Sequence, residues 1–300
     1  MSKYLIRSLH AFLIYATLSG CDNAIKKHFD EIYTSEVYEG LEYDLSSPEV
    51  IINLPPSLNE ISGLSYLNEN SVIAIQDERA IVFIVNLDDG SIVHQQKFGS
   101  SGDYEGIAMV GNTIYVISSS GNLYYFDLNM DEGEVRSGVI ETSITINNDV
   151  EGLTYDEKGN RLLIACKGEG ELGNNMAKGK SIYPFDLKTQ VLEEVPVGSI
   201  RKKELEPFIT SDYPNMKLKN GIGPSGIAIH PLTGKTYILA HDGKAIVILD
   251  ENGKIEKYIP LNPGLFPQPE GICFNQKGDM YISNEASFSL PNIMKFAYRP

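Results

Sequence analysis

One short phrase occurs five times in the sequence, and its spacing limits the folds that the chain can adopt. The copies read "EISGLSY", "DYEGIAMV", "DVEGLTYD", "GPSGIAIH" and "QPEGICFN", and no convincing amphipathic helix lies between them. Their glycines are Gly63, Gly106, Gly152, Gly226 and Gly271, at intervals of 43, 46, 74 and 45 residues. A period in the forties without intervening helices is typical of the four-stranded blades of a β-propeller.

Within a repeat, apolar runs and turns predict four antiparallel strands. The first repeat reads "GLSYL", "SVIAIQD", "IVFIVNL" and "IVHQQKF", and the fourth reads "GIAIHP", "KTYILAH", "AIVILD" and "IEKYIPL". β-Branched and aromatic residues dominate the inner runs, whereas the fourth run is more polar. The sequence therefore predicts an all-β chain of repeated four-stranded sheets.

Two irregularities bear on the number of blades. Residues 198–221 form a polar insertion, which accounts for the long interval of 74 residues. The last repeat supplies three strands before the chain stops at Pro300, and residues 49–54, "EVIINL", precede the first repeat without a partner. If this N-terminal strand completes the last blade, the ring closes and its exposed edges disappear. We expect a five-bladed propeller; a six-bladed ring, with a degenerate blade inside the insertion, is the alternative.

The first twenty residues form a separate unit. Lys3 and Arg7 precede an apolar run from Ala11 to Leu18, which is too short to span a bilayer, and the segment ends in "LSGC". This tetrapeptide resembles a bacterial lipobox, in which cleavage precedes the cysteine and Cys21 receives lipid; an ordinary signal peptide cut nearby is the alternative. We therefore expect a lipoprotein signal peptide over 1–20, a tether over 21–46 and a propeller domain over 47–300.

Charge and cysteine content restrict the partners of this chain. Forty acidic against twenty-five basic residues give a net charge of −15, which is a poor match to a phosphate backbone, so nucleic-acid binding is excluded. Such a protein would be held at a membrane of the bacterial cell envelope by lipid on Cys21 rather than by anionic headgroups. The remaining cysteines, Cys166 and Cys273, lie in apolar strand-like runs of non-adjacent repeats, so we expect no disulfide between them.

Acidic residues recur at the start of the repeated phrase. In a propeller the first strand of each blade lines the axis, and residues two apart in a strand share a face. The residues just before the five glycines should therefore meet at the axis; they are Ser62, Glu105, Glu151, Ser225 and Glu270. On the same face, two residues earlier, stand Glu60, Asp103, Asp149, Gly223 and Gln268.

Three carboxylates in a narrow shaft need compensation. At separations of about 5 Å and an effective dielectric of about 20 they repel by roughly 10 kcal/mol in total. Protonation, a Lys or Arg entering the shaft, or a bound cation would offset this repulsion, and the five motifs contain neither Lys nor Arg.

Carboxylates and hydroxyls suit Ca²⁺, which tolerates irregular oxygen coordination. The column contains no His or Cys, so zinc and copper are poor candidates. We expect Ca²⁺ to be bound by the three glutamates and two serines, with Glu60, Asp103 and Asp149 in the layer behind them. The alternatives are another ion or ordered water, and a packing role in which each glutamate accepts backbone hydrogen bonds from a neighbouring blade.

Several of these stretches carry a family resemblance. The segments "LPPSLNEISGLSYL", "IQDERA", "GDYEGIA" and "NNDVEGLTYDEKGNRLLIACKG" resemble, in this order, the SdiA-regulated family of bacterial envelope propellers, over residues 50–300. Separately, the order Ser, Glu, Glu, Ser, Glu around the axis is similar to the calcium site of the five-bladed calcium-activated nucleotidase (apyrase) family. This second resemblance implies calcium and five blades, and it covers little beyond the axis.

Loops that follow the second strand of each blade are the expected ligand-binding rim. "QDERA" stands where apyrase-like enzymes carry an Asp-Arg turn, so Asp77 and Arg79 resemble a pair that holds phosphate or positions water. The chain has no Trp, however, and the rest of the apyrase pattern is not found. The rim candidates are Asp77, Arg79, Lys167, His241, Asp242, Asn284 and Glu285; solvated surface is the alternative reading of these polar residues.

The sequence favours a membrane-anchored, calcium-stabilised propeller that acts as a ligand-binding or scaffolding module of the bacterial envelope. Its partner would be a small molecule or an envelope protein. The alternative is a metal-dependent hydrolase of phosphate esters or lactones at the axial mouth, which would require a metal that substrate can reach.

Overall fold

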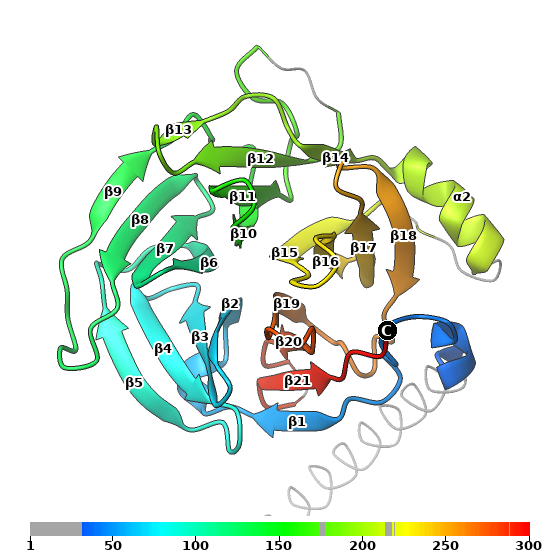
Figure 1. Ribbon diagram of the computed structural model, residues 1–300, viewed down its shortest axis with the longest axis horizontal. Coiled ribbons are helices and arrows are strands. Elements are labelled where there is room, and N and C mark those ends of the chain that lie inside the picture. The colour runs from blue at the N-terminus through cyan, green and yellow to red at the C-terminus, as the bar shows by residue number, and fades with distance from the viewer. Residues whose placement is uncertain (1–31, 175–177, 214–217, 219, 288) are drawn as a thin grey trace, which may run out of the picture.

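Five antiparallel sheets surround a central axis in the part of the chain that the structure describes (Figure 1). The computed structural model describes residues 32–174, 178–213, 218, 220–287 and 289–300. Blade 1 contains β2 (Ile61–Asn68), β3 (Ser71–Gln76), β4 (Ile81–Asn86) and β5 (Ile92–Lys97). Blade 2 contains β6 (Tyr104–Val110), β7 (Thr113–Ser118), β8 (Asn122–Asp127) and β9 (Gly138–Glu141).

The other three blades repeat this order with local changes. Blade 3 contains β10 (Val150–Asp156), β11 (Arg161–Cys166), β12 (Lys180–Asp186) and two short strands that both pair with β12, namely β13 (Val191–Leu192) and β14 (Gly198–Ile200). Blade 4 contains β15 (Gly223–Ile229), β16 (Thr236–Asp242), β17 (Ala245–Leu249) and β18 (Ile255–Pro260). Blade 5 contains β19 (Pro269–Phe274), β20 (Met280–Asn284), β21 (Asn292–Phe296) and β1 (Val50–Asn53).

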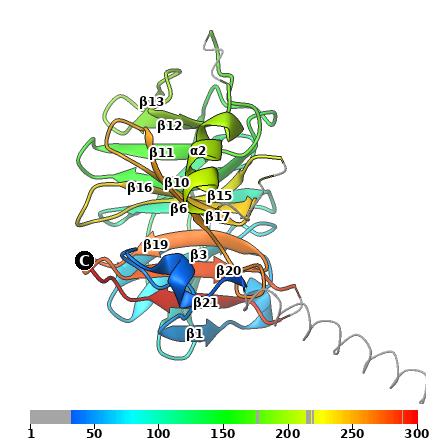
Figure 2. The same ribbon diagram turned by 90° about the vertical axis from the view of Figure 1, so that its right-hand side faces the viewer.

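The N-terminal strand closes the ring, as the sequence predicts. β1 pairs antiparallel with β21, so that Val50 lies opposite Lys295 and Asn53 opposite Asn292. Figure 2 shows β1 alongside β21 near the C-terminus. Blade 5 is thus built from both ends of the propeller, which ties the first blade to the last.

The insertion does not form a sixth blade, and the six-bladed alternative is wrong. Its described part holds β14 and one helix, α2 (Lys202–Asp212), which lies against β18 (Figure 1). Leu205 and Ile209, four residues apart on one helix face, are buried in the apolar cluster between blades 3 and 4. The sequence predicts only a polar insertion here, because two apolar residues give a weak periodic signal.

Apolar side chains are buried between the blades. Each of five clusters combines residues of two neighbouring blades; Phe83 with Ile293 and Phe98 with Phe126 are examples. Both faces of every blade are covered in this way, which explains why the inner strands are apolar on both faces. Cys166 and Cys273 are free and buried in different clusters.

Packed structure begins earlier than the expected boundary at residue 47. The 3₁₀-helix η1 (Ser35–Tyr38) precedes a segment whose Tyr43 and Leu45 are buried between blades 4 and 5. The Tyr38 hydroxyl donates to the Pro260 carbonyl at 3.1 Å, and that of Tyr43 to Gly278 at 2.6 Å. Much of the expected tether is therefore part of the domain. A second 3₁₀-helix, η2 (Pro56–Leu58), leads into β2.

The expected signal peptide and Cys21 lie outside the described residues. Among the residues that are described, no helix is both long and apolar enough to cross a bilayer.

Candidate functional site at the propeller axis

The first strand of each blade lines the axis, and each is irregular at the same position. β2, β6, β10, β15 and β19 contact one another in this order and return to β2. In every blade the register between first and second strand shifts near the motif glycine, as between Tyr104 and Gly106 or between Val150 and Gly152. A bulge of this kind redirects the side chain that it carries. The residues at the shifts are Ser62, Glu105, Glu151, Ser225 and Glu270.

The motif glycines allow these strands to converge. A Cβ atom on Gly106 would lie 2.6 Å from the backbone nitrogen of Leu153 in the next blade, and one on Gly226 would lie 2.6 Å from the Glu270 carbonyl oxygen. Any larger residue would force neighbouring inner strands apart. The repeated phrase thus has two roles: its glycine allows the inner strands to pack closely, and the residue before the glycine places a polar side chain at the axis.

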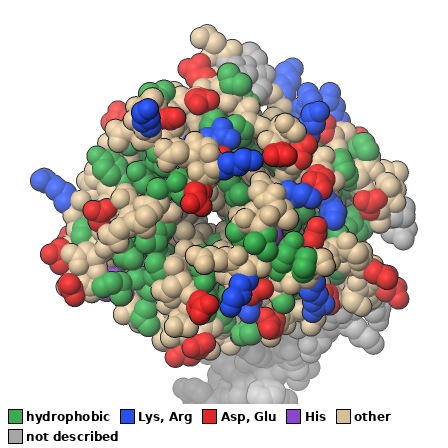
Figure 3. Space-filling view, in the orientation of Figure 1, with side chains coloured by type: hydrophobic (Ala, Val, Ile, Leu, Met, Phe, Trp, Pro, Cys, Tyr) green, Lys and Arg blue, Asp and Glu red, His purple; other side chains and the backbone are tan. Residues whose placement is uncertain are grey.

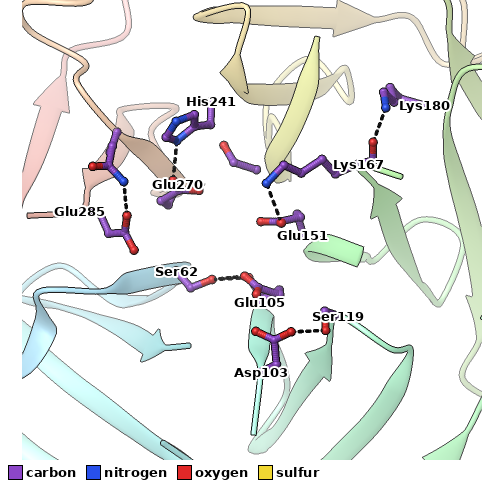
Figure 4. Close-up of polar contacts among 12 residues, drawn as sticks. Ser62, Asp103, Glu105, Ser119, Glu151, Lys167, Lys180, His241, Glu270 and Glu285 are labelled. Carbon is purple, nitrogen blue, oxygen red and sulfur yellow. Dashed lines mark hydrogen bonds and ion pairs between the residues drawn. The ribbon is translucent and has the colours of Figure 1, made fainter. Parts of the chain in front are cut away.

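The convergence leaves a narrow cavity on the axis. Its volume is about 10 Å³, the scale of one water molecule, and the side chains of Glu105, Glu151, Ser225 and Glu270 contribute to its lining. An opening is visible at the centre of the face in Figure 3. Figure 4 shows Ser62, Glu105, Glu151 and Glu270 converging from different blades.

The two serines bond across the blade boundaries. Ser62 Oγ donates to Glu105 Oε2 at 2.9 Å and to the Glu105 carbonyl at 3.0 Å. Ser225 Oγ donates to the Pro269 carbonyl at 2.7 Å. Both hydroxyls therefore help to hold one inner strand against the next.

Basic side chains reach two of the three glutamates. Lys167, which directly follows β11, places Nζ 2.9 Å from Glu151 Oε1, and His241 at the end of β16 places Nδ1 2.7 Å from Glu270 Oε1 (Figure 4). The five motifs contain no Lys or Arg, and the lysine that compensates Glu151 instead follows the second strand of the same blade. The glutamates bond to side chains here, not to the backbone groups that the packing alternative proposed.

Glu105 is the least compensated of the three. Burial, followed by the charge of Glu151, raises the pKa of Glu105 to about 9, although the Ser62 hydrogen bond acts in the opposite direction. Burial also raises the pKa of Glu151, but the bond and charge of Lys167 limit the rise to about 7. Burial lowers the pKa of Lys167 less than Glu151 raises it, so the net shift is upward.

The acidic residues of the layer behind are spread around the mouth. Asp103 Oδ2 accepts a hydrogen bond from Ser119 Oγ, and Asp103 also helps to raise the pKa of Glu105. Glu60 accepts from Gln76 Nε2 at 3.3 Å. Asp149 adopts the left-handed region, with φ of 47°, and its carbonyl accepts from the Lys167 amide at 2.8 Å.

The rim candidates divide into two groups. Asp77 and Glu285 belong to the mouth: burial and then Glu60 raise the pKa of Asp77 to about 6, while burial and then Glu270 raise that of Glu285 to about 7. Arg79 is exposed and turns away from Asp77, because its Nη2 donates to the Ser57 carbonyl and its Nε to Gln76 Oε1. The structure thus does not bring the predicted Asp-Arg pair together.

The other rim candidates also differ in position. Asp242 is exposed at the end of β16. Asn284 is fully buried, and its Nδ2 donates to Asn292 Oδ1 at 3.1 Å, so its placement in a rim loop is wrong. It is the last residue of β20 and points between strands.

The sequence profile of the SdiA-regulated family matches residues 48–170 and 177–292. The chain belongs to the SdiA-regulated family. No curated protein matches the sequence. Among solved structures, the glutaminyl cyclase of Myxococcus xanthus has a TM-score of 0.57 at 11% identity, over 84% of this chain and 96% of that one. U3-55K has a TM-score of 0.48 at 8% identity, over 83% of this chain and 99% of that one. The virginiamycin B lyase of Staphylococcus aureus has a TM-score of 0.44 at 12% identity, over 82% of this chain and 73% of that one. At these identities the likeness extends to the fold alone.

The donor chemistry of this SdiA-regulated propeller can be compared with the expected calcium ion. Glu105, Glu151, Ser225 and Glu270 give the axial cavity its carboxylate and hydroxyl oxygens, which suit a hard cation, and the rest of its lining is glycine, leucine and isoleucine. The half-buried carboxyl group of Glu105 has only a hydroxyl as its partner. Within the described residues, no group of three or more His, Cys, Asp and Glu side chains is placed so that it could hold a metal ion without side-chain movement.

Lys167 and His241, which the sequence predicts on the rim, contact the axial glutamates Glu151 and Glu270, and these contacts were not predicted. Each stands at the C-terminal end of a second strand, beside the N-terminal end of the inner strand of the same blade. That juxtaposition follows from an antiparallel hairpin and was available from the sequence. The direction in which the Lys167 and His241 side chains extend could not be predicted from the sequence.

Proposed function

We propose that this protein is a calcium-stabilised binding module, anchored to a bacterial membrane by lipid on Cys21, that takes up a small molecule or an envelope protein at its axial mouth. The observation that carries this proposal is the group of axial carboxyl groups that lacks a full set of basic partners. Three half-buried glutamates share one lysine and one histidine as basic partners, and Glu105 has only the Ser62 hydroxyl.

A divalent cation would supply the missing positive charge. Glu105, Glu151 and Glu270 would hold it, Ser62 and Ser225 would add hydroxyl oxygens, and Glu60, Asp103 and Asp149 would stand behind them. Calcium tolerates irregular sets of oxygen ligands of this kind, whereas magnesium requires a near-octahedral set. The ion would tie together three inner strands and so rigidify the rim on which a ligand rests.

Thermal unfolding of the purified protein in Ca²⁺ and in EDTA tests the metal. An ion present at about one hundred times its Kd stabilises the folded state by about 2.7 kcal/mol. For a domain of this size that corresponds to a rise in Tm of roughly 5–10 °C. Mg²⁺ serves as the matched control and should give a smaller shift. Identical unfolding curves in Ca²⁺ and EDTA would remove calcium from the proposal.

A second candidate function, hydrolysis of a phosphate ester or lactone, is favoured by one observation. The carboxylate of Glu270 orients the His241 imidazole through Nδ1 at 2.7 Å, and the His241 side chain is 27% exposed at the mouth. An imidazole held in this way can act as a general base toward water.

Turnover of nucleotides and lactones by wild type and His241→Gln separates the two functions. Turnover that depends on Ca²⁺ and disappears in His241→Gln at an unchanged Tm supports the hydrolase. Ligand binding without turnover supports the binding module.

A further inference from the structure

The ammonium group of Lys167 lies at the axial carboxylates. Its Nζ is 2.9 Å from Glu151 Oε1, and the charges of Asp149 and Glu270 also act on it. The Glu151 side chain is only 12% exposed, whereas 32% of the Lys167 side chain faces solvent. Lys167 therefore bridges the buried carboxylate and the open mouth.

The backbone that carries Lys167 is firmly held. The Lys167 amide donates to the Asp149 carbonyl at 2.8 Å, and the next amide, of Gly168, donates to Asn148 at 2.9 Å. Asn148 is buried, and its Nδ2 donates to the carbonyls of Glu169 and Glu171 at 2.9 and 2.7 Å. Only the flexible four-carbon stem of Lys167 is free to change its direction, so the ammonium group can leave Glu151 without any movement of the strand.

We propose that Lys167 is an internal competitor for the axial cation: it neutralises Glu151 in the cation-free protein and swings out to the mouth when Ca²⁺ enters. This inference rests on the proposed calcium binding. Glu151 lines the axial cavity and is also the partner of the Lys167 ammonium group at 2.9 Å, and two cations on one carboxylate repel each other. Lys167 thereby weakens the affinity of the site for Ca²⁺ and keeps the empty site folded.

Replacement of Lys167 by Met keeps the aliphatic stem and removes the charge. In calcium titrations followed by calorimetry, Lys167→Met should bind Ca²⁺ about tenfold tighter than wild type or better, since a competitor has been removed. Without Ca²⁺ the variant should melt at a lower temperature, because Glu151 has lost its partner. The difference in Tm between the calcium-loaded and calcium-free protein should therefore widen.

Two matched variants make the test specific. Lys167→Arg retains a cation and should bind Ca²⁺ within about threefold of wild type. Lys97→Met removes a lysine of a similar ion pair, with Glu134 at 3.0 Å, on the outer strand β5, and should leave calcium affinity unchanged.

The outcomes separate this inference from the proposed function. If wild type binds Ca²⁺ and Lys167→Met binds it equally or more weakly, Lys167 is not a competitor, although calcium binding stands. If only Lys167→Met binds Ca²⁺, the competition is complete and the inference is supported. If neither binds Ca²⁺ while both remain folded, the calcium site and the competitor are both overturned.

Discussion

Replacement of Glu105 by Gln should stabilise the calcium-free protein, which is the opposite of what the loss of a buried hydrogen-bonded residue usually does. Glutamine has nearly the same size, and its Oε1 can still accept the hydrogen bond that Ser62 donates at 2.9 Å. What disappears is a carboxyl group whose pKa is raised from 4.5 to about 9 by burial and by Glu151.

The size of the effect follows from that pKa. At pH 7 a carboxyl group with a pKa of about 9 in the folded state takes up a proton on folding, which costs about 3 kcal/mol relative to a group that keeps its ordinary pKa. Partial exposure of Glu105 reduces this penalty, so we expect a gain of about 1–2 kcal/mol in the free energy of unfolding. That gain corresponds to a rise in Tm of roughly 2–8 °C.

In Ca²⁺ the wild type should be more stable than Glu105→Gln, which reverses the order expected without the ion. In saturating Ca²⁺ the wild type gains the stabilisation of the bound ion, whereas Glu105→Gln has lost a charged ligand and gains less. Thermal unfolding at pH 7 in EDTA and in Ca²⁺ measures both effects, with Glu141→Gln on the exposed outer strand β9 as the control that should change neither. If Glu105→Gln is less stable than wild type in EDTA, the raised pKa of Glu105 does not penalise folding and the reasoning fails.

Two further predictions concern stability away from the metal. Gly106→Ala should destabilise the protein by about 1–3 kcal/mol in urea unfolding, because its Cβ would lie 2.6 Å from the Leu153 backbone. Gly133→Ala, whose Cβ would have its nearest neighbour at 3.9 Å, should be nearly neutral. Equal losses of stability in the two variants would refute the importance of close approach at Gly106. Burial lowers the pKa of His230, whose ring lies 4.7 Å from that of Tyr298. The contribution of His230 to stability is therefore complete above its unfolded pKa of about 6.5, and it is lost as the pH falls through the lower pKa of the folded state. His230→Gln should therefore flatten the loss of stability between pH 7 and 5, and an unchanged slope would exclude His230 as its source.

Local sequence was sufficient for the blade architecture. The strands of a blade are contiguous in the chain, and their alternation of apolar runs and turns is set by backbone sterics and burial. The closing strand over 49–54 was also predictable, because an unpaired strand at one end and a three-stranded blade at the other leave one economical pairing. Helix α2 was missed, since it depends on a tertiary contact of Leu205 and Ile209 with blade 4 rather than on its own periodicity.

In the candidate site, too, some features were predictable from local sequence and others depend on tertiary contacts. Period-two reasoning selected Glu105, Glu151 and Glu270 as a group, yet the strands are bulged at these residues, and the partners that each glutamate receives come from other strands. Nothing in the sequence around Arg79 indicates that its guanidinium turns to the Ser57 carbonyl, or that Asn284 is buried against Asn292. These directions depend on which neighbours occupy the surrounding space.

The sequence by itself determined the four-stranded repeat, the strand that closes the ring and the set of acidic residues that meet at the axis, because all of these follow from patterns along the chain. The choice of five blades over six was decided by the tertiary structure. Only the tertiary structure decided how the charge of those residues is balanced. Lys167 and His241 reach two of the glutamates and Glu105 receives only a hydroxyl, and such pairings are fixed by distances of a few ångströms between side chains.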